Sequence, residues 1–314
     1  MSATGDRPWT GPRVPEQSAT TSHSKPSTLI AVPNVSVGHE AALVTDLVEA
    51  FTGPDEVRAI AEPHYDRDHG RAVFTLAGPP GQLLDGLVAG GRLAVEAIDF
   101  TAHVGSHPCV GVLDVAPLVY LDESQRGIAW VEALVLADRL GHDEGLPVFL
   151  YGEPGGSRTR AELRRGGLMA LVKRVEDGLA APDFGPRRID PRTGAVLVTA
   201  RPPLVAFNVE LAAPAGIDDA VAIAGEIREG GERGLPGVRA IGLRLDERGG
   251  VSQVSVNVED PWAVPLVSVV EAVGAAAPVG ATELVGLAPA VAFADFPKGL
   301  ECRNRATLED ALGF

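Results

Sequence analysis

The chain has 314 residues, of which 45% are hydrophobic and 22% charged, and this composition predicts a globular protein of two domains with a sizeable core. Its formal net charge of −15 makes nucleic acid and anionic membranes unfavourable partners, because both repel an acidic surface. The two cysteines, Cys109 and Cys302, fit neither a disulfide framework nor a zinc-knuckle spacing, so we expect a reducing cytoplasm.

The first segment of the chain, residues 1–28, is rich in Ser, Thr and Pro and lacks the apolar core of a secretory signal. It predicts a disordered tail. The most apolar later stretch, residues 262–293, is interrupted by prolines and glutamates, so it is interpreted as protein core and not as a membrane span.

The next segment, residues 29–193, predicts a first subdomain in which strands and helices alternate. Its polar stretch HYDRDHG, residues 64–70, is interpreted as a connection between two paired strands. The predicted strands are 28–33, 58–62, 71–77, 110–121 and 147–151, and the predicted helices are 40–51, 81–99 and 128–141.

A second set of elements begins near Gly194 and predicts a second subdomain over residues 194–314. It comprises strand-like residues 194–211, a helix at 218–229, strands at 239–245 and 251–258, and a helix at 265–273. The order β-α-β-β-α-β occurs in both sets. We therefore predict an α/β (α+β) fold with two ferredoxin-like βαββαβ subdomains packed around a ligand cleft.

Histidines are clustered along the chain: six of the seven lie between His39 and His142. The densest groups, residues 64–69 and 103–107, fall on predicted loops beside strands, where catalytic groups are commonly displayed. Solvated polar loops without a catalytic role are the alternative interpretation.

A metal-dependent hydrolase using His64, Asp68, His103 and His107 is a competing hypothesis, because these are metal-ligand residue types. The spacing disfavours it. Gly105 lies between His103 and His107 and Pro108 follows, so the two histidines are not expected on one helical face. No metal is expected.

Residues 151–201 are a basic segment in an acidic chain, with ten Lys and Arg residues against six acids. Such a local field can concentrate a polycarboxylate ligand, which arginine grips in a bidentate manner. The part from Arg158 to Arg174 is interpreted as a solvated helix face, whereas the turn-rich FGPRRIDPRTGA, residues 184–195, favours binding.

Several ordered motifs resemble the glutamate formiminotransferase family: VPNVSVG, HVGSHPCVGVLDVAP, PVFLYGE, PDFGP, QVSVNV and ELVGL. The resemblance runs from about Leu29 to about Ala294. It implies transfer of a formimino group from N-formimino-L-glutamate to N5 of tetrahydrofolate, as in histidine degradation, with His107 as the catalytic residue. A histidine whose ordinary pKa is about 6.5 can accept and return a proton at neutral pH.

The resemblance also implies which residues hold the two substrates. It places the folate on Gly185, Pro186, Arg187, Arg188, Ile189, Asp190, Pro191, Arg192, Thr193 and Gly194. It suggests that the donor contacts Asn34, Ser36, His64, Asp66, His69, Arg71, His103, Arg201 and Asn208.

Two further expectations concern the whole protein. Bifunctional family members continue into a cyclodeaminase domain, for which residues beyond Phe314 would be needed, so we expect a monofunctional protein. The resemblance also makes a homodimer an expectation. Val37, Ser106 and Cys109 stand where the family's loops usually carry charge, which keeps open a folate-binding or regulatory paralogue without turnover.

Overall fold

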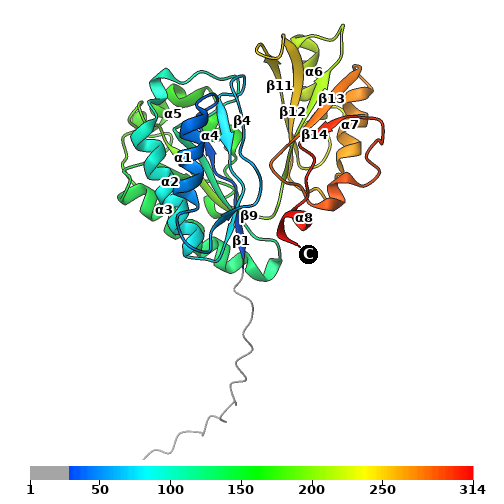
Figure 1. Cartoon of the computed structure of the whole chain (residues 1–314). Helices are drawn as coiled ribbons and strands as arrows, with labels where there is room; N and C mark the ends of the chain where they lie inside the picture. Colours follow the sequence, from blue (N-terminus) through cyan, green and yellow to red (C-terminus); the bar gives the residue numbers. More distant parts are fainter. Residues whose placement is uncertain (1–27, 314) are drawn as a thin grey trace, which may run out of the picture.

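The computed structural model describes residues 28–313 and shows two sheets, each covered by helices (Figure 1). The predicted α/β class is confirmed. The predicted tail falls almost entirely on residues 1–27, outside the described residues. None of the helices described between residues 28 and 313 combines the length and apolarity needed to cross a membrane.

The first half follows the predicted order of elements, with shorter strands than expected. Its helices are α1 (Ala41–Phe51), α2 (Gln82–Ala97), α3 (Arg126–His142), α4 (Arg160–Arg164) and α5 (Gly167–Glu176). Its strands are β1 (Leu29–Ala31), β2 (Asn34–Val35), β3 (Arg58–Ala59), β4 (His64–Asp66), β5 (Arg71–Val73), β6 (Leu76–Gly78), β7 (Leu113–Val119), β8 (Val148–Leu150) and β9 (Val196–Arg201).

The strand β7 is the centre of the first sheet. β1 and β2 follow one another along one edge of β7, and β6 and β5 continue the sheet outward to β3 and β4. β9 lies on the other edge of β7, and β8 pairs with β9; both of these pairings are parallel. The break between β1 and β2 falls at Pro33, which has no N–H to donate to a neighbouring strand.

The strand pairing places the boundary between the halves later in the chain than predicted. The predicted boundary at residue 193/194 lies before β9, yet β9 belongs to the first sheet, with Val115 opposite Leu197. The chain crosses to the second sheet between Arg201 and Val205, where Pro202 and Pro203 have no N–H to donate and separate β9 from the next strand.

The stretch HYDRDHG is also more structured than predicted. Its first three residues form β4, which pairs antiparallel with β5 so that His64 lies opposite Val73. β4 is an edge strand, and polar residues are tolerated there because one side of the strand faces solvent or another part of the chain.

The second half has the strand order β11-β12-β10-β13-β14. Its strands are β10 (Val205–Leu211), β11 (Val238–Leu245), β12 (Val251–Val258), β13 (Val279–Val285) and β14 (Cys302–Arg303), and its helices are α6 (Ile217–Ile227), α7 (Leu266–Gly274) and the short α8 (Leu308–Leu312). The predicted helices at 218–229 and 265–273 are confirmed.

Alternation along β10 explains how this sheet uses both faces. Val205, Phe207 and Val209 are fully buried in a core with residues of α6 and α7. Ala206, Asn208 and Glu210 point to the opposite face, because successive side chains of a strand alternate. That face turns toward the first half, while α1, α2 and α3 cover the outer face of the first sheet (Figure 1).

The two halves contact one another through apolar and polar groups. Ile30 and Val119 of the first sheet pack with Leu287 and Leu308 of the second half. At the other end of the contact, a ring nitrogen of His69 lies 3.1 Å from the Gln253 side-chain oxygen. The inner faces of the two sheets therefore enclose the space between them.

Gly70 gives the first prediction. Its φ is +68°, and an added Cβ would lie 2.3 Å from the carbonyl oxygen of Val104. We expect Gly70→Ala to lower the free energy of unfolding by about 1–3 kcal/mol, because the strained backbone and the clash act together. Urea denaturation would measure this.

The control is Gly127→Ala in α3, where an added Cβ meets nothing within 4 Å. This variant should keep or raise the stability, since glycine in a helix is usually less favourable than alanine. Equal stability of the two variants would contradict the role given to Gly70.

Candidate functional site

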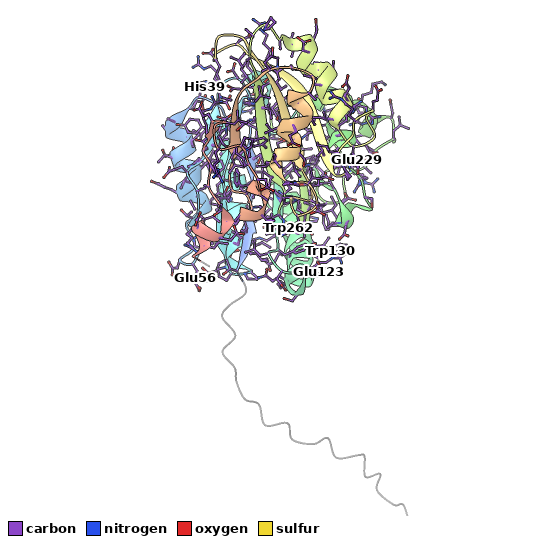
Figure 2. The ribbon with its side chains drawn as sticks, turned by 90° about the vertical axis from the view of Figure 1, so that its right-hand side faces the viewer. His39, Glu56, Glu123, Trp130, Glu229 and Trp262 are labelled. Carbon is purple, nitrogen blue, oxygen red and sulfur yellow. The ribbon has the colours of Figure 1, made fainter. Side chains whose placement is uncertain are left out.

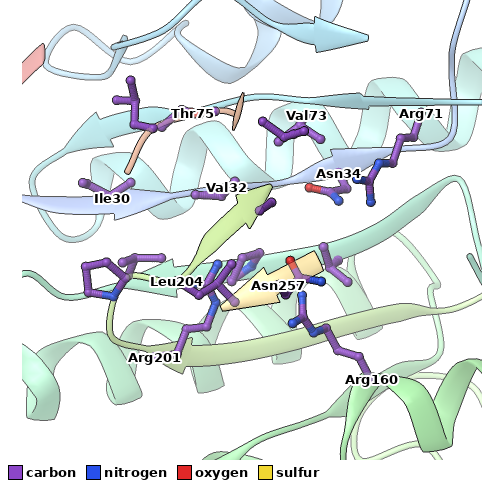
Figure 3. A pocket seen from close by; sticks show the side chains of 18 of the residues that line it. Ile30, Val32, Asn34, Arg71, Val73, Thr75, Arg160, Arg201, Leu204 and Asn257 are labelled. Atoms are coloured by element: carbon purple, nitrogen blue, oxygen red, sulfur yellow. The ribbon is translucent and has the colours of Figure 1, made fainter. Parts of the chain in front are cut away.

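A pocket lies between the inner faces of the two sheets (Figure 3). From the first half it is lined by alternate residues of β1, β2, β5 and β7 together with His107 and arginines of α4 and β9. From the second half it is lined by Leu204, Ala206, Asn257 and Val285. The space at its centre is about 70 Å³.

His107 is placed by close backbone packing of two loops. Gly105 lies so near to Gly70 that a Cβ on Gly105 would be 2.4 Å from the carbonyl oxygen of His69. Ser106 donates from both its backbone N–H and its hydroxyl to the Asp68 carbonyl, each at 2.8 Å. The next residue, His107, is therefore held at the inner face of the sheet, where it is 9% exposed.

Arg71 caps His107. Its guanidinium Nη1 lies 2.7 Å from His107 Nε2. Because a guanidinium only donates hydrogen bonds, Nε2 must accept, and the neutral ring then carries its proton on Nδ1. His107 Nδ1 is buried and has no hydrogen-bond partner among residues 28–313.

Four guanidinium groups reach this pocket, from Arg71, Arg160, Arg164 and Arg201. Arg164 forms a buried ion pair with Asp114 of β7. The structure gives the other three no carboxylate partner within residues 28–313: Arg71 bonds to His107, Arg160 lies over the Tyr151 ring, and Arg201 donates to the Pro202 carbonyl. The pocket therefore carries uncompensated positive charge.

Burial, together with this charge, changes the pKa values of groups in the pocket. Burial, followed by the nearby guanidinium of Arg71, lowers the pKa of His107 well below its ordinary 6.5. Burial also lowers the pKa of Arg71 and of Arg201 to about 10, so both remain cations at neutral pH. At pH 7 the site presents a neutral imidazole among cations.

A larger pocket of about 420 Å³ adjoins the first and shares Arg160, Arg201 and Leu204 with it. It is also lined by residues of β9, of the chain after β8 and of the second half, where Glu259 contributes. Thr199 borders it and donates its hydroxyl hydrogen bond to the Tyr151 carbonyl at 2.7 Å. A ligand could therefore extend from one pocket into the other.

The structure brings together some of the predicted donor-binding residues and separates others. Asn34, Arg71 and Arg201 line the first pocket with His107. Ser36 lies behind it, where its hydroxyl donates to the Gly111 carbonyl at 2.7 Å. His103 also lies outside the residues that line either pocket and stacks on Phe100 at 5.1 Å.

His64, Asp66, His69 and Asn208 form polar contacts near the junction of the halves and do not line either pocket. Asp66 lies 2.7 Å from His69 Nδ1, and although burial alone would raise its pKa, the hydrogen bonds and charge of His69 lower that pKa to about 2. Asn208 lies 3.4 Å from the buried carboxylate of Glu283. His69, through Gln253, and His64, through Asn304, connect the halves in this structure.

The predicted folate loop, residues 185–194, also lies outside both pockets. Arg187 and Arg188 are exposed. Gly194 forms a bridge with Gly111, so the end of the loop packs behind the chain that follows His107. A role in folate binding stays a prediction for this loop.

His39 and Cys109 have partners away from the pocket. His39 lies at an outer edge of the molecule, 3.6 Å from Glu40 (Figure 2). Cys109 lies 3.3 Å from His103, and burial raises the pKa of its thiol to about 12, which disfavours a nucleophilic thiolate. Within residues 28–313, no three His, Cys, Asp or Glu side chains are grouped to hold a metal ion.

Two arginines of the pocket were missed by the sequence interpretation. Arg160 and Arg164 belong to the stretch assigned to a solvated helix face, yet α4 directs both toward the pocket. Their spacing of four residues puts them on one side of a helix, and this spacing could have identified them in the sequence as a pair that faces one site. Asn257 of β12 gave no such signal, because only the facing of the sheets brings it here.

Sequence comparison agrees with this division of the chain. Residues 28–201 match the formiminotransferase domain, N-terminal subdomain, and residues 206–300 match the formiminotransferase domain. The glutamate formimidoyltransferase of Streptococcus pyogenes serotype M1 is 33% identical over 84% of this chain and 90% of its own length. The protein of the same name from Thermoplasma acidophilum is 31% identical over 85% of this chain and 90% of its own.

A longer relative, the formimidoyltransferase-cyclodeaminase of Gallus gallus, is 35% identical over 84% of this chain. The chain spans half the length of that relative. Fold and site define an α/β protein with a cationic ligand pocket between two facing sheets. The chain belongs to the formiminotransferase family.

The low pKa of His107 predicts a pH-dependent stability. The folded protein binds fewer protons than the unfolded chain below pH 6.5, so the contribution of His107 is present above that pH and is lost as the pH falls toward its native pKa. We expect wild type to lose stability relative to His107→Gln between pH 6.5 and 5, measured by urea denaturation at each pH. A constant difference over this range would contradict the lowered pKa.

Proposed function

We propose that this protein transfers a formimino group from N-formimino-L-glutamate, or a related donor, to N5 of tetrahydrofolate. One observation carries the proposal: a buried neutral His107 lies beside guanidinium groups that have no carboxylate partner within residues 28–313. The glutamate formimidoyltransferases among the relatives support it, since the matches cover 90% of their length.

The charge of the pocket favours a donor with two carboxylates. Arg71, Arg160 and Arg201 supply cations that face the same space, and arginine pairs with carboxylates through strong charge-assisted hydrogen bonds. The two carboxylates of such a donor would offset most of the uncompensated charge. Asn34 and Asn257, which line the pocket from the first and the second half, offer amide groups to the formimino end of that donor (Figure 3).

His107 then acts as the general base and acid. The N5 nitrogen attacks the amidine carbon, an N5–C bond forms, and the N5 proton passes to the imidazole. The tetrahedral adduct collapses as the bond between that carbon and the glutamate nitrogen breaks. The imidazolium returns its proton to the departing nitrogen, so glutamate leaves as an amine and His107 is regenerated.

The pocket of about 420 Å³ supports a location for the reduced folate, because its volume suits a drug-sized ligand and it opens onto the donor pocket. Arg158 lines this pocket and pairs with Asp183, two residues before the loop 185–194. The loop therefore starts close to the pocket. We therefore propose that the loop contacts the outer end of the folate, which carries its carboxylates.

Other parts of the proposal concern the setting of the reaction. Both halves have the strand order expected for ferredoxin-like subdomains, with the first strand between the third and fourth, which supports that assignment. We propose a cytoplasmic protein that serves histidine degradation and forms a homodimer. Its family membership supports these three points.

Binding of folate without turnover is the second candidate function. Val37 is buried in the first core, and Cys109 is a neutral thiol at pH 7, so neither loop carries the charge usual in the family. Fewer charges near His107 favour binding without catalysis. An assay of turnover beside folate binding separates the two candidates.

For His107 we expect His107→Ala to lower kcat about 10²–10⁴-fold while tetrahydrofolate still binds, because the variant loses proton transfer and keeps the arginines. Steady-state turnover with formiminoglutamate and tetrahydrofolate measures this, and calorimetry measures folate binding. His142→Ala is the control, since His142 is exposed on α3. Undiminished turnover by His107→Ala would reject the proposed base.

The location of the folate gives a separate prediction. Arg158→Met should weaken tetrahydrofolate binding by about 10-fold or more if the larger pocket holds the folate body, since a charged hydrogen bond contributes about 1.5–3 kcal/mol. Arg187→Ala with Arg188→Ala tests the loop in the same calorimetric measurement. Loss of binding only in the double variant would place the folate on the loop and outside the pocket.

A further inference from the structure

The hydrogen bond between Arg71 and His107 conflicts with a simple role for His107 as base. A neutral imidazole has one nitrogen with a free electron pair and one that carries a proton. In this structure the electron pair of Nε2 accepts the hydrogen bond from Arg71, and Nδ1 must hold the proton. The ring as it stands has no electron pair left to take a proton from a substrate.

The bond to His107 is a weak anchor for a buried cation. Arg71 comes from β5 and has no carboxylate partner within residues 28–313, in contrast to Arg164, which is paired with Asp114. A hydrogen bond from a guanidinium to a carboxylate is about twice as strong as one between neutral groups and can be bidentate. An anionic ligand in the pocket would therefore compete well with the imidazole for Arg71.

We propose that Arg71 is a positioning residue that holds the base of the resting site blocked until a carboxylate of the donor draws its guanidinium away from His107 Nε2. This inference rests on the proposed function and deepens it, because it makes the base available only when an anionic donor is bound. An uncharged amidine would leave Arg71 on His107. The same residue would then determine both donor specificity and the timing of proton transfer.

The groups around His107 set the direction of the expected change. Arg71 of β5, Arg160 and Arg164 of α4 and His69 from the loop after β4 all disfavour its protonation, and Asp114 of β7 offsets Arg164. Moving Arg71 onto a carboxylate removes one of these cations from contact and cancels its charge. The pKa of His107 should then rise.

The experiment uses the full chain and glutarate, a dicarboxylate that cannot react. Two properties of His107 are followed. One is its pKa, by nitrogen NMR with the signal assigned from His107→Gln. The other is its acylation by diethyl pyrocarbonate, a reagent whose carbonyl carbon is attacked by an imidazole nitrogen with a free electron pair. We expect glutarate to raise the pKa of His107 in wild type. In Arg71→Met without glutarate, acylation should be at least about 10-fold faster than in wild type.

Three variants make the test specific. In Arg71→Met the pKa of His107 should be raised without glutarate and should rise less on adding it. Arg71→Gln can still donate to Nε2 but has no charge, so it should keep acylation slow and lose most of the response to glutarate, which also guards against misfolding of Arg71→Met. Arg139→Met should behave as wild type, because Arg139 lies on the outer helix α3 and pairs there with Asp85 of α2.

Turnover separates this inference from the proposed function. In wild type the acid limb of kcat should lie at higher pH than that of kcat/KM, and in Arg71→Met the two limbs should coincide while KM for the donor rises roughly 10- to 100-fold. A response of His107 to glutarate without turnover would support the blocking of His107 by Arg71 and reject the transferase function. If Arg71→Met turns over and its acylation rate and His107 pKa equal those of wild type, the blocking role of Arg71 is overturned and the transferase function is not.

Discussion

The positive charge enclosed between the two sheets is the constraint on which this site depends. Burying a guanidinium without a counter-ion is unfavourable, and Arg71, Arg160 and Arg201 meet no carboxylate within residues 28–313. The fold tolerates this because core packing on the outer faces of both sheets is extensive and independent of the pocket. The proposed anionic donor would offset this unfavourable charge.

The backbone of the first half places His107 beside this charge. The loops around Gly70 and Gly105 pack together through their main chains, at a distance that side chains at these two positions would prevent. This contact lies two residues before His107 and fixes its position. Behind His107, the Asp114 carboxylate accepts a hydrogen bond from the Val110 N–H at 2.8 Å and also pairs with Arg164. One carboxylate thereby fixes the chain after His107 and one wall of the pocket, and a shift of either would alter the other.

Local patterns were sufficient for most elements and for part of the site. The helices α1, α2 and α3 were predicted to within a few residues because their apolar positions recur at helical spacing. The pattern could not show that β9 joins the first sheet, since an apolar strand fits either sheet equally well. It also misread Arg160 and Arg164, because a charged helix looks alike whether it faces solvent or a cavity.

The sequence by itself determined the α/β class, the family resemblance, the choice of His107 as the candidate catalytic residue and the presence of a basic segment in an acidic chain. These follow from composition, periodicity and motif order, which are properties of neighbouring residues. Only the tertiary structure decided which predicted residues meet: Asn34, Arg71 and Arg201 join His107, whereas His64, Asp66, His69 and Asn208 contact groups at the junction of the halves. The reason is physical: those meetings depend on how two sheets face each other, and sequence spacing carries no information on that distance.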